Sequence, residues 1–162
     1  FELLKNHGNH NITETFKNLN LSHLKTLIVD DNKINIAILK KILENVNIKV
    51  DVAHNGKVAV EKVKANNYNM VFMDIHMPEM DGFEATQLIR KFNTDLKIFG
   101  LSANVTSEAM DKALDSGMNN YITKPFTKEQ LYNLILITLE YNELIGKPFS
   151  TKETIEEIGS HN

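Results

Sequence analysis

The segment Met70-Val71-Phe72-Met73-Asp74 consists of four apolar residues followed by a carboxylate. A run this short, with no polar residue to face solvent, is typical of a strand that is covered on both faces of a parallel sheet. Similar runs recur at residues 26–29, 50–53, 98–101 and 121–122. The run at 50–53 alternates polar and apolar residues, which indicates an edge strand.

Longer segments with apolar residues at helical spacing separate these runs. The alternation predicts repeated strand-helix units, and five such units suit an open, doubly wound parallel α/β sheet. We predict that the apolar positions of the helices face the core: Ile34, Ile38, Leu39, Ile42, Leu43, Phe83, Leu88, Ile89, Phe92, Met110, Ala113, Leu114, Leu131, Leu134, Ile135 and Leu139. Asn55-Gly56 and Asp81-Gly82 should open the second and third helices, Ser107 should cap the fourth, and Ser116-Gly117 should end it.

Four of the five predicted strands end at or just before a carboxylate, hydroxyl or ammonium side chain. Asp30 and Asp31 follow the first run, Asp74 the third, Ser102 the fourth and Lys124 the last. Ligands of open α/β sheets bind where the carboxyl ends of the strands meet. Three carboxylates, a hydroxyl and an ammonium at that edge predict a cation pocket with a nucleophile, which is suited to accepting a phosphoryl group.

The composition excludes several other classes of protein. The 162 residues are 42% apolar, which is enough for one core. A net charge of -3 provides no basic field for nucleic acid, so we expect no direct binding to it. The absence of cysteine excludes disulfides and thiolate metal sites. No apolar stretch approaches the roughly 20 residues that span a bilayer, so we expect no membrane contact by this segment and a cytoplasmic location.

Four motifs carry a resemblance to a known family. They are Val29-Asp30-Asp31-Asn32, Met73-Asp74-Ile75-His76-Met77-Pro78-Glu79-Met80-Asp81-Gly82, Leu101-Ser102-Ala103 and Tyr121-Ile122-Thr123-Lys124-Pro125-Phe126. Together, in this order, they resemble the receiver domain of two-component response regulators, over roughly residues 24–144. The resemblance implies a flavodoxin-like fold with five parallel strands in the order 2-1-3-4-5.

The resemblance also implies roles for the site residues. Asp74 would be the phosphoacceptor, because a carboxylate can form an acyl phosphate. Mg²⁺ would be held by Asp31 directly, by Asp30 through water, by Asp74 and by the backbone carbonyl of His76. The acidic pair could instead cap the helix that starts near Asn32, and Asp31 could do both.

The remaining roles concern the response to the phosphoryl group. Lys124 would pair with Asp74 and then with the phosphoryl oxygens, and the family typically has a cis bond between this lysine and Pro125. Ser102 would donate a hydrogen bond to a phosphoryl oxygen, and Tyr121 would turn from an exposed to a buried position. The face built from the fourth helix, fifth strand and fifth helix would change, and it could form a homodimer. For the His76 imidazole we expect no catalytic role.

The chain divides into three predicted parts. Residues 1–23 form an N-terminal linker in which Ile12, Phe16 and Leu19 could anchor a short helical turn, and residues 1–4 resemble the last strand of a kinase catalytic domain. Residues 24–145 form the receiver domain. Residues 146–162 form a tail or a linker toward a histidine phosphotransfer domain.

A hybrid sensor histidine kinase, membrane-anchored elsewhere, is the preferred parent, with a histidine kinase or histidine phosphotransfer domain as partner. The receiver itself would catalyse only its own phosphotransfer and dephosphorylation. A stand-alone single-domain regulator and an interaction module without phosphorylation are the alternatives. A phosphohydrolase of the haloacid dehalogenase type would need a second aspartate two residues after its nucleophile, following the first strand, and this pattern is absent from Asp30-Asp31-Asn32-Lys33. A flavin-binding module would be disfavoured by the acidic pair.

Overall fold

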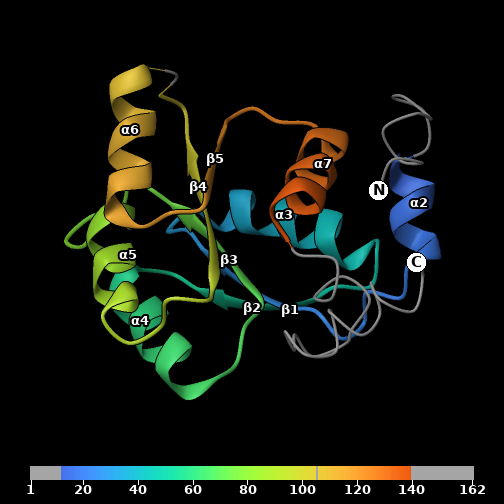
Figure 1. The fold of residues 1–162 in the computed structure, drawn as a ribbon, viewed down its shortest axis with the longest axis horizontal. Helices are drawn as coiled ribbons and strands as arrows, with labels where there is room; N and C mark the ends of the chain where they lie inside the picture. The colour runs from blue at the N-terminus through green and yellow to red at the C-terminus, as the bar shows by residue number, and fades with distance from the viewer. Residues whose placement is uncertain (1–11, 105, 140–162) are drawn as a thin grey trace, which may run out of the picture.

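Five parallel strands form one sheet in the computed structural model, which describes residues 12–104 and 106–139 (Figure 1). The strands are β1 (Lys25–Val29), β2 (Lys49–Ala53), β3 (Met70–Asp74), β4 (Lys97–Ser102) and β5 (Asn120–Thr123). Their order is β2-β1-β3-β4-β5, which confirms the predicted flavodoxin-like topology and the edge position of β2.

Helices cover both faces of this sheet. The helices are α2 (Ile12–Asn18), α3 (Lys33–Glu44), α4 (Gly56–Ala65), α5 (Gly82–Arg90), α6 (Ser107–Ser116) and α7 (Lys128–Thr138). Helices α3 and α7 lie on one face, and α4, α5 and α6 lie on the other, as Figure 1 shows. Helix α2 packs outside the first layer, against α7. We find no helix in the described ranges with the length and apolar character needed to cross a bilayer.

Alternate residues of the central strands supply the two halves of the core. On β3, Met70 and Phe72 face the layer that contains α3 and α7, whereas Val71 and Met73 face the layer that contains α4, α5 and α6. The ring of Phe72 stacks on that of Phe99 from β4, with 4.9 Å between centroids. Both faces of these strands are therefore buried, which explains their nearly continuous apolar sequences.

Some helix residues that we predicted to face the core lie on the surface instead. On α3, the buried face passes through Ile36, Leu39 and Leu43, while Ile34 and Ile38 are 70% and 54% exposed. This helix is apolar on more than one side, so its spacing alone does not select the buried face. The prediction is also wrong for Phe92, Met110 and Leu114, which are exposed.

The helix ends agree with the predicted signals at all positions but one. Asn55 and Asp81 cap α4 and α5 through their side chains. Helix α6 is capped by Thr106, whose hydroxyl accepts the amide hydrogen of Ala109, and not by Ser107 as predicted. Gly117 ends α6 with a φ of 109°, a left-handed conformation that favours glycine.

Helix α2 is fastened to the domain by Phe16. This side chain is fully buried, and its ring stacks on Tyr132 of α7 at 5.2 Å between centroids. Ile12 and Leu19 pack beside it, which confirms the three predicted anchors. The predictions for residues 1–4 and for the tail or linker at residues 146–162 lie outside the described residues.

Candidate functional site

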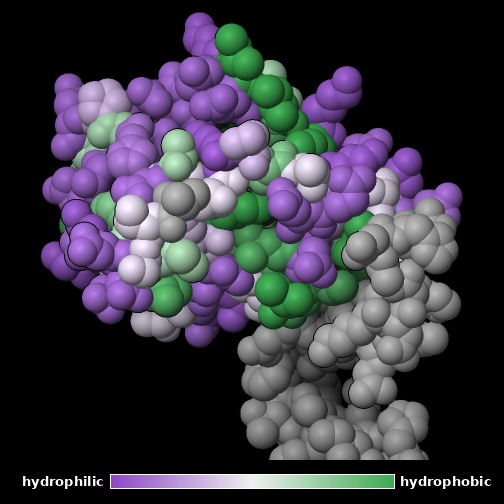
Figure 2. All heavy atoms as spheres, turned by 90° about the horizontal axis from the view of Figure 1, so that it is seen from above, coloured by the Kyte–Doolittle hydropathy of each residue, from purple (hydrophilic) through white to green (hydrophobic). Residues whose placement is uncertain are grey.

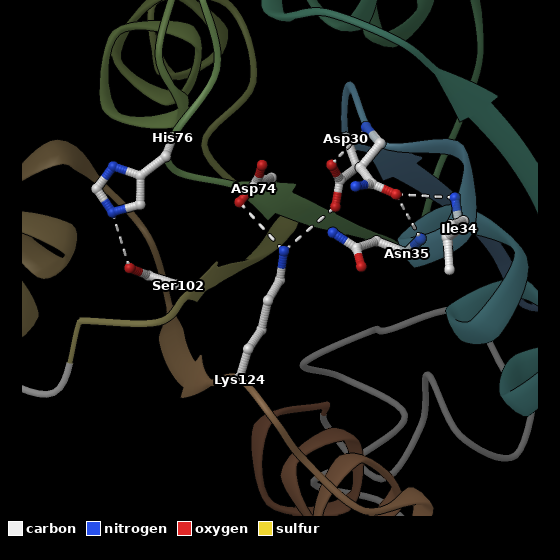
Figure 3. Close-up of polar contacts among 8 residues, drawn as sticks. Asp30, Ile34, Asn35, Asp74, His76, Ser102 and Lys124 are labelled. Carbon is white, nitrogen blue, oxygen red and sulfur yellow. Dashed lines mark hydrogen bonds and ion pairs between the residues drawn. The ribbon is translucent and has the colours of Figure 1, made fainter.

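The register of the sheet brings the predicted site residues to one edge. Val29 of β1 is paired with Met73 of β3, so Asp30 and Asp74 end neighbouring strands at the same level. Ser102 of β4 is paired with Thr123 of β5, which places Lys124 just beyond. In Figure 1 this carboxyl edge points upward, and Figure 3 shows the side chains that meet there.

Three carboxylates form the centre of this edge. Asp30, Asp31 and Asp74 can each direct one oxygen to a common point, with these oxygens within 4.8 Å of one another. Asp30 and Asp74 are buried, at 2% and 6% exposure, whereas Asp31 is exposed to solvent. A cluster open on one side, with oxygen donors only, fits the ligand preference of Mg²⁺, which keeps several waters.

The helix that follows β1 is capped by Asn32 and not by the acidic pair. The Asn32 side chain accepts the amide hydrogens of Ile34 and Asn35 at 2.9 and 3.1 Å. One Asp30 oxygen accepts the Asn32 amide hydrogen at 2.9 Å, which fixes the orientation of that carboxylate. The capping alternative for the pair is therefore wrong, and the carboxylate of Asp31 remains directed to the cluster.

Lys124 joins the two buried carboxylates. Its ammonium lies 3.3 Å from an Asp30 oxygen and 3.4 Å from an Asp74 oxygen, as the dashed lines in Figure 3 indicate. Its backbone amide donates to the carbonyl of Ser102 at 2.8 Å, and its bond to Pro125 is cis, as the family resemblance implied. The lysine is thus anchored at its backbone and directed at the acceptor.

Burial and neighbouring charge oppose ionisation of Asp74. Burial, followed by the charge of Asp30, raises the pKa of the Asp74 carboxyl to about 6, and Lys124 offsets part of this rise. Two carboxylates share one lysine, so the centre carries excess negative charge when Asp74 is ionised. A divalent cation at the carboxylates would relieve that excess.

Gly82 allows the start of α5 to lie against the end of β3. A Cβ atom at this position would fall 2.5 Å from the backbone oxygen of Asp74 and 2.9 Å from the Cα atom of Ile75. The Gly82 amide donates to the Ile75 carbonyl at 2.9 Å. Only glycine fits this approach, which holds the backbone around Asp74.

Ser102 and Tyr121 belong to a second polar group beside the acceptor. Ser102 is 1% exposed, and its Oγ lies 3.0 Å from His76 Nε2. The same oxygen accepts the amide hydrogen of Asn104 at 3.0 Å. Tyr121 is in a buried position, where its hydroxyl donates to the carbonyl oxygen of Asn104.

Sequence reasoning missed the contact of the His76 side chain with Ser102. The signal was available, because β3 and β4 are neighbours and both residues lie at their carboxyl ends. What could not be read from the sequence is the rotamer that turns the imidazole toward the hydroxyl.

A groove of about 370 Å³ lies on the other side of Lys124. Its walls combine polar groups of the site with apolar side chains: Asp30, Asn35, Ile38, Leu39, Leu101, Lys124, Pro125 and Phe126. Figure 2 looks onto this edge of the molecule and shows a band of hydrophobic surface between two hydrophilic areas.

Several known proteins resemble this chain in sequence and in fold. A sequence model described as the response regulator receiver domain matches residues 26–136. The hybrid signal transduction histidine kinase K of Dictyostelium discoideum is 37% identical over 129 residues, which cover 74% of this chain and 11% of that protein. The chain therefore spans about a tenth of the length of this relative.

Two solved structures share the fold at 28% and 30% identity. One is the receiver domain of a sensor histidine kinase from Pseudomonas aeruginosa with a magnesium ion coordinated in the active site cleft; the match has a TM-score of 0.65, 28% identity, and covers 76% of this chain and 98% of that one. The other is the receiver domain of Ssk1 from Saccharomyces cerevisiae, in a complex with the histidine phosphotransfer protein Ypd1, with a TM-score of 0.65, 30% identity, and coverage of 74% and 95%.

Proposed function

The chain belongs to the response regulator receiver domain family, and from this premise we propose that Asp74 accepts a phosphoryl group from a phosphohistidine. The observation that carries the proposal is the buried Asp74 carboxylate, which faces the Lys124 ammonium at 3.4 Å and lies beside two further carboxylates. A nucleophile, a fixed cation and a set of metal ligands are the parts that phosphoryl transfer requires.

The transfer needs an ionised Asp74. An oxygen of its carboxylate attacks phosphorus, the bond from phosphorus to the donor imidazole nitrogen breaks, and the imidazole keeps the electron pair. The product is an acyl phosphate on Asp74. With a pKa of about 6, Asp74 is mostly ionised at about pH 7, so no general base is required.

The surrounding residues neutralise and hold the transferred group. Asp30, Asp31, Asp74 and the backbone carbonyl of His76 would hold Mg²⁺, which supplies positive charge to the phosphoryl oxygens when bound. Lys124 is already shared by Asp30 and Asp74, and it would move its ion pairing to the new phosphoryl oxygens. The closeness of the three carboxylate oxygens supports the metal ligands, and the family resemblance supplies the roles of the His76 carbonyl and of Lys124.

A change at the acceptor would reach the surface through Ser102 and Tyr121. The Ser102 hydroxyl would donate to a phosphoryl oxygen, and Asn104 connects it to the Tyr121 hydroxyl by the contacts of its backbone amide and carbonyl. Tyr121 lies beneath the face of α6, β5 and α7, where Met110, Leu114 and Ile137 are exposed. We expect this apolar face to report the phosphorylated state to a partner or a second copy.

The phosphoryl donor is proposed to be a histidine kinase or a histidine phosphotransfer domain. Ile34 and Ile38 are exposed on α3, and Ile38 also lines the groove next to Lys124. An exposed apolar stripe next to the acceptor suits a helix that presents its histidine to Asp74. The yeast complex with Ypd1, reported for a relative at 30% identity, supports this partner class.

A hybrid histidine kinase is the proposed parent protein. The curated relative from Dictyostelium carries this name, and the match covers 11% of it. Residues 1–23 would then connect a kinase core to the receiver, and residues 146–162 would lead away from it. A stand-alone regulator is the second possibility, and sequencing the surrounding reading frame separates the two.

The test is the intact mass after incubation with acetyl phosphate, with Mg²⁺ and with EDTA. We expect one added phosphoryl group on the wild-type chain, dependent on the metal and lost in Asp74→Asn. Asp111→Asn removes an exposed aspartate of α6 and should still be labelled. Label on Asp74→Asn would overturn the assignment. If no label forms, binding of beryllofluoride distinguishes rapid hydrolysis from a domain that acts without phosphorylation.

A further inference from the structure

The contact between His76 and Ser102 has no part in the proposed transfer. The two side chains come from neighbouring strand ends and lie 3.0 Å apart. Figure 3 shows the Ser102 hydroxyl directed at the imidazole and not at the Asp74 carboxylate. The residue that should respond to the phosphoryl group is thus bound to another partner.

The hydrogen-bonding capacity of Ser102 makes this contact consequential. A hydroxyl has one hydrogen to donate and two lone pairs. The Asn104 amide occupies one lone pair at 3.0 Å. With its hydrogen on Nδ1, the His76 ring accepts the only hydroxyl hydrogen; with its hydrogen on Nε2, the ring donates to the second lone pair. In both tautomers the hydroxyl oxygen is held on the His76 side.

We propose that His76 is a positioning residue that holds the Ser102 hydroxyl away from the acceptor until a phosphoryl group replaces it as partner. This inference rests on the proposed function of Asp74. In either tautomer the Ser102 oxygen must leave the His76 nitrogen to reach the acceptor, so His76 lowers the affinity of the site for a phosphoryl group. The Asn104 amide contacts Ser102 and its carbonyl contacts Tyr121, so hydrogen bonds connect the Ser102 hydroxyl to the already buried Tyr121.

The affinity for beryllofluoride, measured in Mg²⁺ at one fixed pH, provides the test. Loss of one hydrogen bond that competes with the bound state should tighten binding about fivefold in His76→Ala. In a Ser102→Ala background the same change should have no effect, because the hydroxyl is gone. His76→Gln carries an amide at a similar distance from its Cα atom and should restore the wild-type affinity.

The double substitution separates positioning from a general effect of the ring on access to the site. The proposal is overturned if His76→Ala changes the affinity equally in the wild type and in Ser102→Ala. It is also overturned if His76→Ala, with Ser102 present, binds beryllofluoride more weakly than the wild type. If the wild type binds beryllofluoride no better than Asp74→Asn does, that result would instead refute the proposed function. In that case the ring-nitrogen chemical shifts of His76 still decide the contact, because they should change in Ser102→Ala, and unchanged shifts would refute it.

Discussion

Replacing Asp74 by asparagine should stabilise the domain when no divalent cation is present. Burial and the charge of Asp30 raise the pKa of Asp74 from its ordinary 3.8 to about 6. A pKa difference of one between the folded and unfolded states corresponds to about 1.36 kcal/mol, so ionisation of Asp74 destabilises the folded state by about 3 kcal/mol. The asparagine side chain has almost the same shape without the charge, and Lys124 keeps Asp30 as its partner. We expect a gain of about 1–3 kcal/mol in the free energy of unfolding at about pH 7.

The difference in stability between Asp74→Asn and the wild type should grow as the pH rises. Between about pH 4 and pH 6 the folded wild type binds more protons than the unfolded chain, so its stability falls as the pH rises through this window. Asp74→Asn lacks this group, and the difference between the two proteins should vanish below about pH 4. Urea unfolding followed by circular dichroism, in EDTA and at a series of pH values, measures it.

A matched variant controls for loss of an arbitrary negative charge. Asp111 is exposed on α6, and Asp111→Asn should change stability by no more than about 0.5 kcal/mol at any of these pH values. The reasoning is refuted if Asp74→Asn is less stable than the wild type at about pH 7, or if its advantage is the same at about pH 4.

Three further changes probe the same edge of the sheet. Mg²⁺ at 100 times its dissociation constant should raise the free energy of unfolding of the wild type by about 2.7 kcal/mol. In urea titrations with and without the ion, Asp31→Asn should lose most of this gain. An undiminished gain in Asp31→Asn would place the ion elsewhere. Lys124→Met should lower the free energy of unfolding, measured in urea, by about 2–4 kcal/mol, because it leaves two buried carboxylates without their shared cation. An equal loss when Lys124→Met is made in Asp74→Asn would contradict the shared pairing. Gly82→Ala should cost about 1–3 kcal/mol in urea unfolding, because its Cβ would lie 2.5 Å from the Asp74 backbone oxygen; stability equal to that of the wild type would show that this backbone moves aside easily.

The placement of the site could be predicted because it depends on strand ends. Once residues 26–29 and 70–73 are interpreted as parallel strands, the residues after them must meet at one edge, whatever the details of packing. The prediction that the site residues share this edge therefore required no knowledge of side-chain conformation. These residues are Asp30, Asp74, Ser102 and Lys124. The topology followed from the family resemblance, and the sheet has that order.

The buried side of α3 could not be predicted in this way. Ile34 and Ile38 repeat at helical spacing as well as Ile36 and Leu39 do, and contact with the sheet decides between the two sides. The cap of α6 was missed for a related reason, because Thr106 and Ser107 are adjacent and both carry a hydroxyl that can cap. The contact of His76 with Ser102 depends on a rotamer, which spacing does not encode.

Tyr132 gives helix α2 a mechanical connection to the acceptor. Its ring stacks on Phe16, and its hydroxyl donates to the carbonyl of Ile42 on α3 at 2.7 Å. Helix α3 starts just after Asp31, and α7 starts four residues after Lys124. The stacked pair Phe16 and Tyr132 thus contacts both α3 and α7, the helices that follow the carboxylates and the lysine. A displacement of α2 would therefore act on α3 and α7 together, and these helices begin beside the carboxylates and beside Lys124.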